Sequence, residues 1–241
     1  MTDMPFEPST ATASEEVLVA FQDPMYRAAV VDLLGAIAYG ELSAFERLAE
    51  DAKMAPGIED KTELAAMAST EFGHFCGLRD RLVELGEDPF AAMEPFQKPF
   101  DSFHERTAPR DWLEGLIKAY VGDGLAADFY REIAAFVDAD SRALIIDSLE
   151  DAGQSVFVVD RVRKAIEADH RVGGRLALWG RRLMGEALSQ AQRVAAERDA
   201  LSGLLAGGVD RPGMDLAAIG RMFARLAENH EKRMAQLGLD S

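Results

Sequence analysis

The sequence predicts an all-α protein: an up-down four-helix bundle built from two antiparallel helix hairpins, with two additional helices at the C-terminus. Apolar residues recur at the spacing of one helix face along several long segments. No segment alternates apolar and polar residues with the period of two expected of a half-buried strand. Glycine or proline separates the helical segments. With 241 residues, the chain can bury one substantial core, so we expect one helical domain over residues 24–241 after a flexible arm, residues 1–23.

The first hairpin is the clearest part of this prediction. Helical patterns cover about residues 24–54 and 59–85, and Pro56-Gly57 separates them. Gly86 is expected to stop the second helix, with Pro89 just beyond it. Two helices joined by so short a break pack as antiparallel neighbours.

The remaining helices follow a long crossover. Residues 87–108, rich in proline and phenylalanine, are expected to form this crossover, which can hold a short helix. We expect helices at about 109–137, 141–169, 175–201 and 214–237. Gly173-Gly174 is expected to interrupt the pattern between the second and third of these, and residues 202–213 to form a loop before the last.

The charge balance limits the class of partner. The net charge of −16 and pI of about 4.7 argue against broad electrostatic attraction to nucleic acid or anionic lipid. The single cysteine, Cys76, excludes an internal disulfide framework and fits a reducing compartment. No basic leader precedes an apolar core, and every long apolar window contains charge. We therefore expect a cytoplasmic protein without a membrane span.

Positive charge is concentrated in one segment. Residues 161–198 carry nine basic and four acidic side chains. Two interpretations stay open: these arginines pair with acidic neighbouring helices, or they form a local dock for phosphate. The candidate contacts for the dock are Arg171, Arg175, Arg181 and Arg182.

A carboxylate and an imidazole interrupt the apolar face of the second helix. Glu71 and His74 lie three residues apart, so their side chains project side by side. The other members of this face are Leu64, Met67, Leu78, Leu82 and Leu85. An unpaired carboxylate at such a position costs several kcal/mol, so it usually has a partner or a metal. A Glu-x-x-His pair by itself is weak support for metal binding, because a partly exposed polar pair has the same pattern.

Glu41 interrupts the first helix in the same way. It falls in the middle of an apolar face made by Val30, Leu34, Ile37, Phe45 and Leu48. Glu41 lies fifteen residues before Pro56, and Glu71 lies fifteen residues after it. Residues equally far from the turn of an antiparallel hairpin sit at the same height. We therefore predict one metal site made by Glu41, Glu71 and His74.

The second half of the site is expected near the other hairpin. Relative to a turn at Ala139, Asp123 lies sixteen residues before, and Asp151 and Gln154 lie twelve and fifteen after. Asp128, eleven residues before the turn, is the alternative to Asp123. The four carboxylates of Glu41, Glu71, Asp123 and Asp151 would neutralise two divalent cations. Carboxylate and imidazole ligands suit iron or manganese, and zinc is also compatible.

Other conspicuous residues are expected to be structural. The segment Glu167-x-x-His170 also has the Glu-x-x-His sequence. However, His170 lies thirty-one residues past the turn at Ala139, too far along the chain to join the site. His230 is expected to be a hydrogen-bonded core histidine. The aromatic residues Trp112 and Trp179 are expected to pack, and Asp101, His104 and Glu105 to lie at the surface.

This pattern resembles the ligand set of the ferritin-like di-iron carboxylate superfamily, which uses two carboxylates and two Glu-x-x-His pairs. The chain is most similar to the tRNA isopentenyladenosine hydroxylases, over about residues 25–200. The stretches that carry the likeness include residues 119–124 and 185–193. Where that family has its second Glu-x-x-His, this chain has Asp151-x-x-Gln154, and an amide is a poorer ligand than an imidazole. A second iron is therefore expected to bind weakly or not at all.

The resemblance implies an oxygen-activating di-iron hydroxylase. Its substrate would be a prenylated adenosine in tRNA, contacted through the four arginines named above, and an electron donor protein would supply reducing equivalents. Two alternatives remain: a ferroxidase or peroxidase of the same superfamily, and a non-catalytic helical scaffold with a degenerate metal site. A homodimer is compatible with each of these three candidate functions.

Overall fold

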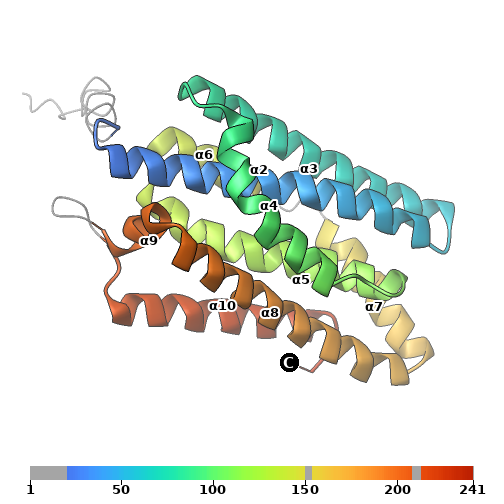
Figure 1. Ribbon diagram of the computed structural model, residues 1–241. Coiled ribbons are helices and arrows are strands. Elements are labelled where there is room, and N and C mark those ends of the chain that lie inside the picture. The colour runs from blue at the N-terminus through green and yellow to red at the C-terminus, as the bar shows by residue number, and fades with distance from the viewer. Residues whose placement is uncertain (1–20, 150–153, 208–212, 241) are drawn as a thin grey trace, which may run out of the picture.

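The computed structural model describes residues 21–149, 154–207 and 213–240. Helices α2 (Pro24–Asp51) and α3 (Ile58–Glu84) lie side by side as an antiparallel hairpin (Figure 1). A short 3-10 turn, Ala52–Met54, and the Pro56-Gly57 break connect them. The prediction of this hairpin is confirmed.

Local hydrogen bonds explain where these two helices begin and end. The Asp23 side chain accepts hydrogen bonds from the backbone N–H groups of Met25 and Tyr26, and so caps α2. At the end of α3, Gly86 has φ of 77°, a left-handed conformation that glycine adopts without steric cost. The N–H of Gly86 donates to the carbonyl of Val83 at 2.9 Å. Gly86 therefore stops the helix, as its sequence position predicts.

The crossover is more helical than the sequence indicates. Helix α4, Pro89–Arg106, is 18 residues long and contains Pro95 and Pro99. Asp88 caps it by accepting from the N–H of Phe90 at 2.9 Å. An internal proline costs a helix about 3 kcal/mol, which is why the sequence favours a crossover with at most a short helix. Burial of Met93, Phe96 and Pro99 offsets that cost.

Helix α4 crosses directly over α2 (Figure 1). The crossing point is Gly35, where an added Cβ would lie 2.3 Å from the carbonyl oxygen of Ala92. No real Cβ tolerates that distance from a backbone atom. The absence of a side chain at Gly35 therefore allows α4 to approach the bundle.

Six further helices complete the described fold. They are α5 (Trp112–Ile133), α6 (Ala139–Ser148), α7 (Gln154–Ala168), α8 (Arg171–Glu197), α9 (Asp199–Ala206) and α10 (Leu216–Gln236). The described ranges contain no strand, so the all-α prediction holds for them. Helix α5 packs against α7, α8 and α10, while α2 packs against α3, α4, α5 and α9.

Three predicted boundaries differ from the structure. The segment expected as one helix over 141–169 is described as two, α6 and α7. Helix α8 begins before Gly173-Gly174 and runs through both glycines. Helix α9 occupies the start of the loop expected over 202–213.

The glycine pair is tolerated because of its place in α8. Gly173 and Gly174 lie in the first turn, where fewer helical hydrogen bonds are at stake than in the middle of a helix. Further along α8, Leu176, Trp179 and Leu183 are buried. Each glycine costs about 1 kcal/mol relative to alanine, and this tertiary burial outweighs it.

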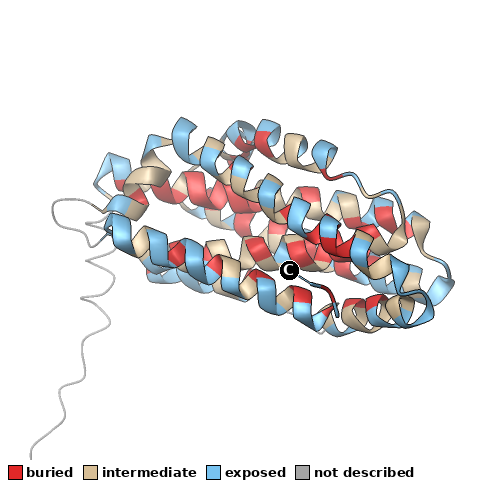
Figure 2. Cartoon of the chain, turned by 90° about the horizontal axis from the view of Figure 1, so that it is seen from below, coloured by how far each residue is buried: buried red, intermediate tan, exposed pale blue. Residues whose placement is uncertain are grey.

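Buried residues lie along the inner faces of the helices (Figure 2). The apolar ones form two clusters. One cluster joins α3, α5, α7 and α8, and the other joins α2, α3, α4 and α6. Residues 24–54 also have the length and apolar composition of a membrane-spanning helix. However, 61% of their most apolar window is buried inside the bundle, as is typical of the core helix of a soluble protein.

We predict that Gly35→Ala lowers the free energy of unfolding by about 1–3 kcal/mol, the usual cost of overpacking. The added methyl group collides with the Ala92 carbonyl and pushes α4 away from α2. Urea unfolding followed by circular dichroism measures the change. The matched control is Gly220→Ala in α10, where nothing lies within 4 Å of the added Cβ. The control is expected to stabilise the protein by up to about 1 kcal/mol. Equal stability of Gly35→Ala and the parent would contradict the close crossing.

Candidate metal centre

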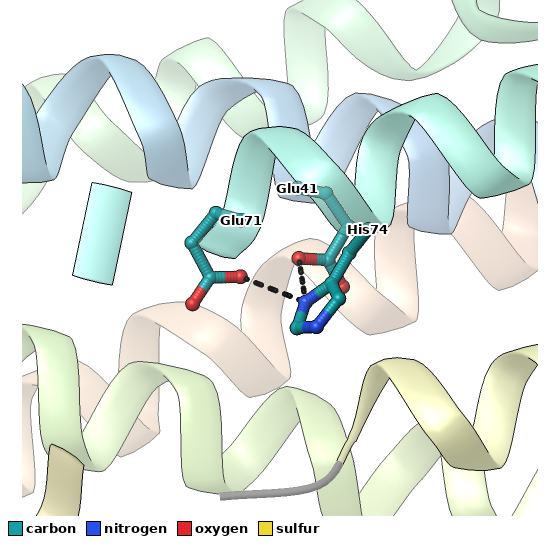
Figure 3. Close-up of side chains that lie close together, drawn as sticks. All are labelled: Glu41, Glu71 and His74. Carbon is teal, nitrogen blue, oxygen red and sulfur yellow. Dashed lines mark ion pairs between the residues drawn. The ribbon is translucent and has the colours of Figure 1, made fainter. Parts of the chain in front are cut away.

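Three side chains from the first hairpin meet inside the bundle. Glu41 projects from α2, and Glu71 and His74 project from α3 (Figure 3). One ligand atom from each lies within 4.8 Å of the other two. His74 Nδ1 is 3.6 Å from Glu41 Oε2 and 3.5 Å from Glu71 Oε2. Helices α2 and α3 thus bring together Glu41, Glu71 and His74, the three residues that were predicted to form one site.

The cluster is buried and poorly hydrogen-bonded. Glu41 and Glu71 are only 8% and 9% exposed. The Nδ1 atom of His74 is buried and makes no hydrogen bond to any residue that the structure describes. Two carboxylates and an imidazole nitrogen therefore lie close together, but the nitrogen makes no hydrogen bond to either carboxylate. These ligand atoms fit a divalent cation.

The pKa values of the cluster reflect the burial of its carboxylates and their contacts with one another and with His74. Burial raises the pKa of Glu41 to about 8, assisted by neighbouring Glu71. Burial also acts to raise the pKa of Glu71, but His74 and Glu41 more than compensate and leave it below its ordinary value. The two glutamates raise the pKa of His74 to about 10. Without metal, protons on His74 and Glu41 balance the buried negative charge, and a metal ion would have to displace them.

The residues predicted for the second half-site have different surroundings. Asp123 lines the same cavity as the cluster. Asp128 accepts a hydrogen bond from Arg233 at 2.6 Å and also lies 3.6 Å from Arg131. Asp151 lies outside the described residues, as does the side chain of Gln154, whose backbone begins α7. Within the described residues, the only group of three or more potential ligands is Glu41, Glu71 and His74.

The cluster opens into a cavity of about 440 Å³. Its walls come from α2, α3, α4, α5, α6, α7 and α10. A second, mostly apolar cavity of about 210 Å³ shares part of its wall. The residues that line both cavities are Phe100, Phe103, Gly122, Ala126 and Tyr130.

His104 belongs to the cavity, so the prediction that it is a surface residue is wrong. It is half-buried, and its Nε2 lies 3.2 Å from the hydroxyl of Ser43. Burial lowers the pKa of His104 to about 3, and the positive charges of Lys118 and Arg47 add to the effect. The sequence misleads here because α4 reads as a crossover rather than as a helix with an inward face. Asp101 and Glu105 are exposed, as expected.

Two residues that line the cavity, Lys118 and Tyr130, were not predicted from the sequence. Lys118 lies at helical spacing from buried Val121 and Leu125, and this spacing could have indicated that its side chain faces inward. Tyr130 is 9% exposed, and burial together with the charge of Glu41 raises the pKa of its hydroxyl. Lys118 and Tyr130 are, like Glu41, polar residues within an apolar helix face, the pattern from which Glu41 was predicted.

The other histidines lie apart from the cluster. Glu167 and His170 are both exposed at the junction of α7 and α8. His230 is 5% exposed, as expected of a core residue. Neither of its ring nitrogens has a hydrogen-bond partner among the described residues, which differs from the expectation. Trp179 is buried and donates its indole N–H to the carbonyl of Glu114 at 2.9 Å.

The arginines considered for tRNA make contacts within the chain. Arg175 pairs with Glu114 at 2.6 Å and with Asp111 at 2.8 Å. Arg181 and Arg182 each donate to a backbone carbonyl, and Arg171 is exposed. The ion pairs of Arg175 agree with the interpretation that arginines of residues 161–198 pair with acidic residues of neighbouring helices. A contact with tRNA stays a prediction.

A comparison with protein families gives one match. A family model described as "Ferritin-like domain, actinomycetes" matches residues 24–208. The matched segment contains every helix from α2 to α9, and with them Glu41, Glu71 and His74. No curated protein matches the chain.

We predict that Glu71→Ala and His74→Ala each remove bound metal and abolish the thermal stabilisation that metal gives, because each takes one of three ligands from the cluster. Elemental analysis and melting curves with and without metal measure these effects. His170→Ala is the matched control, since His170 is exposed and distant in sequence from the cluster. Equal metal content in Glu71→Ala and the parent would refute the ligand assignment.

We also predict that metal binding releases protons. His74 with a pKa of about 10 and Glu41 with a pKa of about 8 both hold a proton at neutral pH. Affinity for Fe²⁺ should therefore rise with pH, by about tenfold per pH unit for each proton displaced, and the rise should become shallower once Glu41 is ionised. Calorimetric titration in two buffers of different ionisation enthalpy counts the protons. A pH-independent affinity would show that the cluster is not the binding site.

Proposed function

Because the chain belongs to the ferritin-like domain family of actinomycetes, we propose that it is an iron-dependent oxidoreductase. Glu41, Glu71 and His74 would hold iron at the wall of the internal cavity, and an organic molecule bound in that cavity would be hydroxylated with O2. One observation carries this proposal. A buried imidazole nitrogen, which has no hydrogen-bond partner in the part of the chain that the structure describes, lies between two buried carboxylates, and all three residues line a cavity.

The ligand types favour iron or manganese, and zinc is also compatible. Bound iron would supply the reaction of O2 with an unactivated C–H bond, which amino-acid side chains cannot carry out alone. The protein supplies the surroundings. The carboxylates of Glu41 and Glu71 balance the charge of a divalent cation, so the buried site becomes neutral when His74 is deprotonated.

The cavity itself orders the reactants. Phe100, Phe103 and Tyr130 form apolar walls next to the cluster and keep bulk water from an enclosed substrate. The hydroxyl of Tyr130 is protonated at neutral pH, as in an ordinary tyrosine, and its raised pKa keeps it protonated in more alkaline solution, so it can donate a hydrogen bond. Exclusion of water protects a reactive oxidant from side reactions.

A second iron remains part of the proposal. Asp123, Asp151 and Gln154 are its proposed ligands, and Asp128 is the alternative to Asp123. Asp128 forms an ion pair with Arg233, which a metal would have to replace if Asp128 were the ligand. The amide of Gln154 is a weak ligand, so the second iron would be the more easily lost.

Prenylated adenosine in tRNA is the substrate that the sequence resemblance implies, with a separate protein as electron donor. Both remain predictions. The net charge of −16 and the internal ion pairs of Arg175 provide little support for extensive RNA contact.

Iron reconstitution without oxygen tests the proposed function. We expect about one tightly bound iron per chain, or about two if Asp123, Asp151 and Gln154 complete the second site. We also expect O2 uptake that continues only while a reductant such as ascorbate is supplied, and loss of that uptake in Glu71→Ala. His170→Ala is again the control. A parent protein that binds no iron would support the scaffold alternative, whereas uptake that stops once the added Fe²⁺ is oxidised would support a ferroxidase.

A further inference from the structure

A buried lysine lies in the cavity away from the metal cluster. Lys118 of α5 is 6% exposed, and its Nζ makes no hydrogen bond with any residue that the structure describes. Its ammonium group lies 5.6 Å from the centre of the Phe103 ring. An ammonium group without a hydrogen-bonded partner is costly to bury, so this group is suited to an anion that enters the cavity.

The charged neighbours of Lys118 leave it incompletely neutralised. Asp51 of α2 is 8% exposed and attracts Lys118, but it makes no hydrogen bond with the Lys118 ammonium group. Arg47, which also lines the cavity, pairs with Glu50 at 3.0 Å. Burial lowers the pKa of Lys118 to about 8 and raises that of Asp51 to about 6. Lys118 therefore carries a positive charge at neutral pH in a largely apolar setting.

The tautomer of neighbouring His104 follows from its hydrogen bonds. The hydroxyl of Ser43 donates to the carbonyl of Gly40 at 2.9 Å, so its oxygen must accept from Nε2–H of His104 at 3.2 Å. His104 is neutral, and its buried Nδ1 then carries a lone pair without a donor among the described residues. His104 adds no positive charge. Lys118 is thus the principal buried cation of this end of the cavity.

The rest of the space suits an apolar body. Phe103, which faces the Lys118 ammonium, lines both the larger cavity and the smaller apolar cavity beside it. The larger cavity is lined by Lys118 and also by Glu41, Glu71 and His74. A molecule with one charged end and an apolar remainder could therefore contact Lys118 and still reach the metal cluster.

We propose that Lys118 binds the carboxylate of an organic acid substrate whose apolar body extends along the cavity to the Glu41, Glu71 and His74 cluster. This inference rests on the proposed function, because it names the substrate class of the same site. A single carboxylate matches the one ammonium of Lys118. A phosphate dianion would leave a second negative charge close to Asp51, which opposes it.

Calorimetric titration of the full chain with octanoate tests the proposal, with octan-1-ol as the uncharged comparison. We expect the parent to bind octanoate about tenfold or more tightly than octan-1-ol, as a charge-assisted hydrogen bond requires. Lys118→Met should remove this preference, and Lys118→Arg should retain part of it. Lys98→Met is the matched control, because Lys98 is exposed on α4. Asp51→Asn should tighten octanoate binding, since it removes a repelling carboxylate.

The titrations are repeated on metal-free and iron-loaded protein, and the iron content of each variant is measured. No preference for octanoate in the parent, or the same preference in Lys118→Met, would overturn the inference. Binding of octanoate only to iron-loaded protein would also overturn it, because the metal would then be the carboxylate's partner. If the parent binds no iron yet shows the Lys118-dependent preference, the proposed function fails while the carboxylate site stands.

Discussion

The burial of two carboxylates between α2 and α3 is the constraint on which the site depends. Glu41 and Glu71 are almost inaccessible to solvent, and His74 is the only basic group in their cluster. Carboxylates in such a place repel each other and lose their hydration, and the raised pKa of Glu41 records both effects. A divalent cation held by Glu41, Glu71 and His74 would remove this repulsion. A proton on His74 does so only in part, since Nδ1 makes no hydrogen bond to either glutamate.

The packing of α4 and α5 turns this cluster into the wall of a cavity. Helix α4 approaches α2 closely at Gly35, and its aromatic side chains close one side. Helix α5 lies along the other side and contributes Lys118 and Tyr130. The cavity is thus lined by buried carboxylates, a buried ammonium group and aromatic side chains. This distribution of charge is the reason for proposing an elongated organic substrate rather than free iron or peroxide alone.

The first hairpin was predictable in detail because its determinants are local. The break at Pro56-Gly57 and the equal spacing of Glu41 and Glu71 around it are properties of the chain, and antiparallel packing of two joined helices follows from the short connection. The same reasoning was less successful from residue 87 onward. Prolines in α4 and glycines in α8 normally interrupt helices, but here burial of neighbouring apolar residues outweighs their cost.

The sequence by itself determined the all-α class, the first hairpin and the meeting of Glu41, Glu71 and His74, because helix periodicity and distance from a turn act through neighbouring residues. Only the tertiary structure decided that His104 and Lys118 face the same cavity, and that Asp128 is paired with Arg233. These contacts join α4 to α2 and α10 to α5. Helices so distant in sequence are positioned by shape and burial across the whole bundle, which the spacing of residues along one helix does not specify.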